Sequence, residues 1–79
     1  MEMIQEEVFK VVSNILEVPF QEVNEDSNPD TFPQWDSLQH MNLILALEEK
    51  LGIQFREDQI VNMKNVKLII LAVTELKKG

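Results

Sequence analysis

The sequence contains no cysteine and no tyrosine, and it has only two glycines and three prolines in 79 residues. Without cysteine the chain can form neither a disulfide nor a thiolate metal site, so its fold must depend on helix packing. The absence of thiols fits a reducing compartment, and any thiol chemistry would need a sulfur supplied from outside. A domain of this size buries only about 60% of the surface that its unfolded chain exposes, which predicts a single domain with a modest core.

Long apolar runs are also missing. The longest uninterrupted one, Leu68 to Val73, is much shorter than the ~20 residues that span a bilayer. The amino-terminal stretch MEMIQEEV carries acids where a signal peptide has basic residues. No linker is visible at either end of residues 1–79. These features predict one free-standing domain in the cytoplasm, monomeric and without membrane insertion.

Positive charge is absent from the middle of the chain, and the net charge is −7. No lysine or arginine lies between Lys10 and Lys50. The sign of this charge excludes nucleic acid and anionic membranes as partners, and it favours proteins with a basic surface. Solubility alone is the alternative explanation. The acids in this stretch are Glu17, Glu22, Glu25, Asp26, Asp30, Asp36, Glu48 and Glu49.

Apolar residues recur at helical spacing in three segments, one ending near Val18, one spanning Ser37 to Lys50 and one following Asn65. A short turn of helix is expected within Phe55 to Val61. No strand pattern appears. The sequence therefore predicts an all-α four-helix bundle with three main helices and a short third one.

The residues between these segments carry turn and capping signals. Residues 19–35 hold all three prolines, which predicts a long loop. Loops of this length in a compact domain are usually either functional or flexible. Asp36 is the predicted N-cap of the second helix, with Gln39 completing a capping box. Gly52 is the predicted stop of that helix, and Asn65 the cap of the last one. The expected core anchors of the loop are Phe20, Val23 and Phe32.

The second helix carries two apolar arcs when its residues are spaced at about 100°. Leu43, Ile44, Leu47 and Leu51 form a stripe that is expected to face the core. Leu38, Met41 and Leu45 form a second arc, which flanks Ser37. Either the short third helix covers this second arc, or it stays partly exposed as a docking surface or the lip of an apolar pocket.

Asp36, Ser37 and His40 invite comparison with a hydrolytic triad, but the pattern argues against an enzyme. Asp36 could hardly orient His40 while it caps the helix, and no glycine-rich segment offers an oxyanion hole. His40 falls among the core leucines, which predicts a packed, hydrogen-bonded side chain.

The acidic loop matches only part of a calcium-binding loop. Asp26, Asn28 and Asp30 fit the first ligand positions, but Thr31 and Ser37 stand where an EF-hand needs glycine and glutamate. No dedicated metal site is predicted, and weak binding of divalent cations stays open.

Ser37 is the remaining candidate. A serine in the first turn of a helix keeps its hydroxyl at the surface, and the positive end of the helix favours an attached phosphate. This is the arrangement that a covalent phosphodiester needs.

The segment DSLQHMNLILALEEKLGIQF closely resembles the motif of acyl carrier proteins, and the likeness extends ungapped through Asn65 and Val66. The resemblance implies that Ser37, next to Asp36, carries 4′-phosphopantetheine, transferred from coenzyme A by a phosphopantetheinyl transferase. Acyl groups would then be bound to this arm as thioesters. The arm supplies the thiol, which explains the missing cysteine. The resemblance also implies a face read by acyl-activating or acyl-transferring enzymes, formed by Leu38, Met41, Leu45 and Glu48.

The sequence departs from the fatty-acid-synthesis pattern at Gln39 and Asn42, where acids are usual, and at Trp35, where a small residue is usual. The WDSL form is more similar to stand-alone carriers of specialised pathways, and Trp35 is expected to pack against the helix start. An aminoacyl or peptidyl carrier and an unmodified acidic interaction module stay open as alternatives. A cavity for long cargo would be lined by Leu43, Ile44, Leu47, Ile60, Met63 and Ile69.

Overall fold

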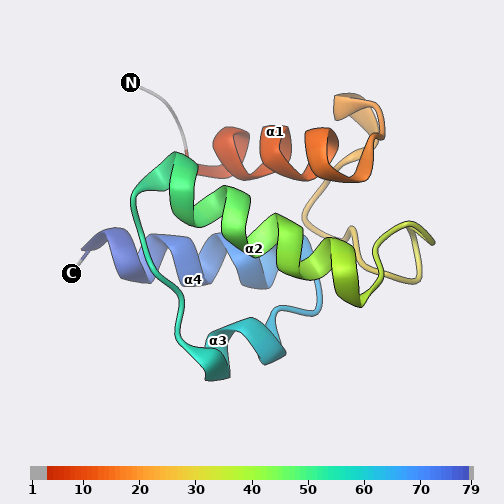
Figure 1. Cartoon of the computed structure of the whole chain (residues 1–79). Coiled ribbons are helices and arrows are strands. Elements are labelled where there is room, and N and C mark those ends of the chain that lie inside the picture. Colours follow the sequence, from red (N-terminus) through yellow and green to blue (C-terminus); the bar gives the residue numbers. More distant parts are fainter. Residues whose placement is uncertain (1–3, 79) are drawn as a thin grey trace.

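The computed structural model describes residues 4–78, so the outermost residues of the predicted 1–79 domain lie outside the described part. The described chain is all-helical and contains no strand (Figure 1), as predicted. The elements in chain order are α1 (Ile4–Leu16), a 3-10 helix (Phe20–Glu22), α2 (Ser37–Leu51), α3 (Glu57–Asn62) and α4 (Val66–Lys78).

The three long helices pack side by side. α2 runs antiparallel to α1, α4 runs in the same direction as α2, and the short α3 lies on the side of α2 away from α1 (Figure 1). The starts of α2 and α4 are therefore at the same end of the bundle, next to the long loop. The buried core draws on all three long helices, the loop and the segments around α3: Val8, Val11, Val12, Leu16, Val23, Phe32, Trp35, Leu43, Ile44, Leu47, Phe55, Met63, Val66, Ile69 and Val73.

The first helix ends at Leu16, two residues before the predicted end. Glu17 adopts a left-handed conformation with φ of 56°, which stops the helix as a C-terminal residue of this kind commonly does. The backbone N–H of Val18 then donates to the Ser13 carbonyl at 3.1 Å, and the Ser13 hydroxyl donates to the Val18 carbonyl at 2.6 Å. The helix therefore ends before Pro19, at the left-handed Glu17.

Two of the three predicted loop anchors are confirmed, because Val23 and Phe32 are buried. The prediction for Phe20 is wrong, since 41% of its surface is exposed. Its ring packs edge-to-face on Phe9 of α1, with ring centroids 6.3 Å apart, outside the buried core. Phe20 therefore packs at the surface of α1 and not in the core.

The long loop caps the start of α4. The N–H of Val66 donates to the Ser27 carbonyl at 2.9 Å, and the N–H of Lys67 donates to the Glu25 carbonyl at 3.0 Å. Asn65 Oδ1 accepts from the N–H of Leu68 at 2.9 Å, which confirms Asn65 as the predicted cap. Side chain and loop together satisfy amides that a helix start leaves without intrahelical acceptors.

Gly52 ends α2 in the left-handed region with φ of 66°, as predicted. An added Cβ would meet no atom within 4 Å, so the cost of a side chain here is backbone strain alone. We expect Gly52→Ala to lower the free energy of unfolding by about 1 kcal/mol, and Gly52→Asn to cost less, because asparagine tolerates this conformation. Urea unfolding of the two variants measures the difference, and equal stability of Gly52→Ala and the parent would contradict the assigned helix end.

Candidate functional site at the start of α2

Ser37 is the first residue of α2 and is exposed. The carboxylate of Asp36 accepts from the N–H of Gln39 at 2.9 Å, which confirms the predicted N-cap. The second half of the predicted capping box is wrong. The Asp36 N–H donates instead to the Gln34 carbonyl at 3.0 Å, and the Gln39 side chain donates to the Ile15 carbonyl of α1 at 3.2 Å.

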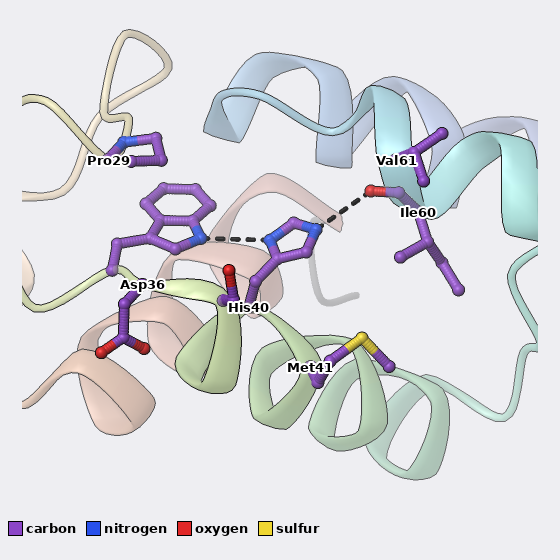
Figure 2. A pocket seen from close by; sticks show the side chains of 8 residues that line it. Pro29, Asp36, His40, Met41, Ile60 and Val61 are labelled. Atoms are coloured by element: carbon purple, nitrogen blue, oxygen red, sulfur yellow. Dashed lines mark hydrogen bonds between the residues drawn. The ribbon is translucent and has the colours of Figure 1, made fainter.

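A groove of about 620 Å³ lies beside Ser37, between the loop, the first turns of α2, and α3 (Figure 2). Its volume is in the range of pockets that take small ligands. This groove differs from the cavity predicted for long cargo. Of the six residues predicted to line that cavity, only Ile60 lines the groove. The Leu43, Ile44 and Leu47 side chains are instead buried in the core. The groove is lined by Pro29, Trp35, Asp36, Ser37, His40, Met41, Ile60 and Val61.

His40 and Trp35 form one wall of the groove. The Trp35 Nε1–H donates to His40 Nδ1 at 3.1 Å, and His40 Nε2 donates to the Ile60 carbonyl at 3.0 Å (Figure 2). Trp35 is only 3% exposed. The predictions of a hydrogen-bonded His40 and of a Trp35 packed at the helix start are confirmed. With both ring nitrogens bonded to these two partners, His40 is not arranged as a base for Ser37.

The second apolar arc of α2 is not covered by α3. The exposed fractions are 71% for Leu38, 46% for Met41 and 58% for Leu45. Val61 of α3 is 71% exposed and shares the groove with Met41, so it extends the arc across to α3. Sequence reasoning missed Val61, because a helix as short as α3 gives too few turns for its outer face to be recognised.

Glu48 differs from the three apolar residues with which the sequence groups it. Its carboxylate accepts from the N–H of Phe55 at 2.9 Å, and the residue is only partly exposed. Glu48 therefore fixes the segment that leads into α3. No sequence signal points to this bond, because it joins residues on either side of a helix end and a turn.

Charge is distributed unevenly along α2. Its single basic residue, Lys50, lies in the last turn and pairs with Glu7 of α1 at 3.5 Å. The end of α2 at Ser37 carries Asp36 and no basic residue from this helix. Gln39 and Asn42, which stand where acids are usual, bond to each other at 2.8 Å, and Gln39 also bonds to α1.

Of the loop residues considered as calcium ligands, Asn28 uses its side chain in the loop's own turns, and Asp26 and Asp30 take part through their backbone N–H groups. Asn28 Oδ1 accepts from the N–H groups of Asp30 and Thr31 at 2.8 and 3.0 Å, and Asn24 Oδ1 accepts from the N–H of Asp26 at 2.8 Å. Within residues 4–78 no group of three or more histidine, cysteine, aspartate or glutamate side chains is arranged to hold a metal ion.

The cap at Asp36 gives a direct test of how the site is held. We expect Asp36→Ala to lower the free energy of unfolding by about 1 kcal/mol, because one amide of the first turn loses its acceptor. Asp36→Asn should retain most of the stability, since asparagine caps as well as aspartate does. Denaturant unfolding compares the two variants. Equal losses in both would show that the charge, and not the hydrogen bond to Gln39, supplies the stabilisation.

The fold is that of an acyl carrier protein. A solution structure of the holo acyl carrier protein from Geobacter metallireducens superimposes with a TM-score of 0.84 over 94% of this chain and 85% of that one, at 23% sequence identity. The predicted four-helix fold of the acyl-carrier type is therefore confirmed.

Part of the chain is also similar in sequence to two proteins named as acyl carrier protein homologs. It is 35% identical over 43 residues to an acyl carrier protein homolog of Ureaplasma parvum, and 37% identical over 46 residues to one of Mycoplasma genitalium. These matches cover 54% and 56% of this chain, and the chain spans just over half the length of each relative, 56% and 55%. No protein-family model matches the chain.

The names of these proteins describe carriers and none describes an enzyme, in agreement with the predicted absence of catalysis. Over the part of the chain that the structure describes, no helix has the length and apolar character needed to cross a membrane.

Proposed function

We propose that the chain is a carrier whose Ser37 is the attachment point for 4′-phosphopantetheine. The observation that carries the proposal is the exposed position of Ser37 as the first residue of α2, at the edge of the groove. Asp36 caps one amide of the first turn, and the other amides at a helix start favour a phosphate group placed there.

The residues present fit this group. The hydroxyl lies at a helix N-terminus that favours a phosphodiester, and the adjacent groove is mostly apolar and large enough for part of a pantetheine chain. When attached, 4′-phosphopantetheine would supply the thiol that this cysteine-free chain lacks and hold an acyl group there as a thioester.

Attachment uses one atom of this chain. Ser37 Oγ forms a bond to the β-phosphorus of coenzyme A within the active site of a phosphopantetheinyl transferase, and its proton passes to a base of that enzyme. The P–O bond to the α-phosphate breaks, and adenosine 3′,5′-bisphosphate leaves. Asp36 and the hydrogen bond to Gln39 keep the start of α2 formed, so that the hydroxyl stays at the surface.

The exposed arc of Leu38, Met41 and Leu45, with Val61, is the proposed contact surface for the transferase and for acyl-activating or acyl-transferring enzymes. The acidic charge of the chain and the absence of basic residues from the first turns of α2 fit partners with basic surfaces. Glu48 would contribute charge at the edge of this surface while it holds Phe55.

The experiment that tests the proposal is the intact mass of the chain after incubation with coenzyme A and a promiscuous phosphopantetheinyl transferase. We expect the mass of one 4′-phosphopantetheine to be added per chain. A chain that never gains this mass would instead be an unmodified interaction module that uses the same exposed arc. The natural cargo, acyl or aminoacyl, follows from the mass of the loaded protein isolated from its own cells. The WDSL form favours a specialised pathway.

A further inference from the structure

The wall between the groove and the core is held by two hydrogen bonds in series. Tryptophan can only donate, so His40 Nδ1 must be the acceptor and the ring proton must lie on Nε2, which donates to the Ile60 carbonyl. The two rings lie at 21° to each other, with centroids 6.2 Å apart. The rings are therefore close to parallel, and the two hydrogen bonds connect the loop, through His40, to α3.

This surface separates two different environments. Trp35 and Ile60 line the groove on one side and pack with the core on the other. Leu43, Leu47 and Ile69 belong to the same buried core as Trp35 and are fully buried. None of these three residues lines the groove, so a group held there would reach them only if Trp35 or Ile60 moved.

His40 is the residue that opposes such movement. α3 is a single short helix, and the His40–Ile60 bond ties its backbone directly to α2. Opening the wall would leave the N–H of the nearly buried Trp35 indole without its acceptor. A buried donor without a partner costs more free energy than a donor that exchanges its partner for water.

We infer that His40 is a positioning residue that sets the cargo range of this carrier, an inference that depends on the proposed attachment at Ser37. By holding Trp35 and α3 together, it keeps the groove closed toward the core. The carrier then accepts short acyl groups, which lie in the groove against Trp35, Met41 and Val61. Long alkyl chains gain no position in the core, and the part of the chain that extends past the groove stays exposed to solvent and partners.

The test compares acetyl-loaded and decanoyl-loaded forms of the full chain, with loading verified by intact mass before any other measurement. For the parent protein we expect the two forms to unfold at the same temperature. For His40→Ala we expect the decanoyl form to unfold several degrees above the acetyl form, because the chain then binds the native core. Ser13→Ala is the matched control, since it removes a side-chain hydrogen bond at the end of α1, outside the groove, and it should show no such difference.

A second measurement does not depend on how well His40→Ala folds. In the parent protein, nuclear Overhauser contacts of the decanoyl chain should reach Met41 and Val61 and not Leu47 or Ile69. Trp35 is the only tryptophan, so its indole N–H signal reports on the wall directly and should persist in both loaded forms. Contacts to Leu47 or Ile69 in the loaded parent would overturn this inference alone. Failure to gain the arm would overturn the proposed function as well.

Discussion

Ser37→Ala is expected to abolish attachment of 4′-phosphopantetheine and to leave the fold nearly unchanged. Attachment is lost completely because no other atom at this position can form the phosphodiester. Stability should change by less than about 0.5 kcal/mol, since Ser37 is exposed and the cap is made by Asp36. Intact mass after incubation with coenzyme A and a transferase measures the first effect, and thermal unfolding measures the second.

Ser13→Ala is the matched control for this experiment. It also replaces a serine hydroxyl by hydrogen, but at the end of α1, where the hydroxyl donates to the Val18 carbonyl. We expect this variant to be loaded like the parent and to lose some stability instead. Loading of Ser37→Ala to the same mass as the parent would show that another residue accepts the arm.

Leu47→Ala is expected to cost about 2–5 kcal/mol, which is a large part of the total stability of a chain this small. Leu47 of α2 is fully buried in the core, so truncation removes apolar contacts and leaves a cavity. At the usual stability per residue, a 79-residue domain has only roughly 4–12 kcal/mol in all. Urea unfolding should show a strongly lowered midpoint, with part of the population unfolded at physiological temperature.

Leu45→Ala makes the same chemical change on the same helix, at a side chain that is 58% exposed. We expect a change in stability of less than about 0.5 kcal/mol and slower loading by the transferase, because the residue lies on the proposed contact surface. Equal destabilisation by the two variants would contradict the assignment of the two arcs. Unchanged loading kinetics of Leu45→Ala would remove Leu45 from the contact surface.

The sequence predicted the features that are encoded locally. The Leu43, Ile44 and Leu47 stripe, the Asp36 and Asn65 caps and the Gly52 stop each depend on residues within a few positions of one another. Periodicity and capping chemistry are visible at that range. The exposed position of Ser37 follows from the same local rules.

What sequence reasoning missed depends on partners that are distant along the chain. The Gln39 side chain bonds to Ile15 instead of completing the capping box, and His40 reaches Ile60 of α3. The cavity for long cargo stays a prediction, and three of the six residues expected to line it, Leu43, Leu47 and Ile69, are fully buried. Helical spacing places residues on a face, but it does not show whether neighbouring elements fill the space behind them, as Trp35 does at the groove.

The contacts between the long loop and the start of α4 have a consequence for how sequences of this type can vary. Ser27 and Glu25 each supply a carbonyl to an amide of α4, so the path of the loop backbone is part of that helix's capping. A deletion or insertion between Val23 and Phe32 would withdraw both acceptors at once. We therefore expect loop length to be constrained here by a helix that begins some forty positions further along the chain, and any relative with a different length must satisfy those amides by other means.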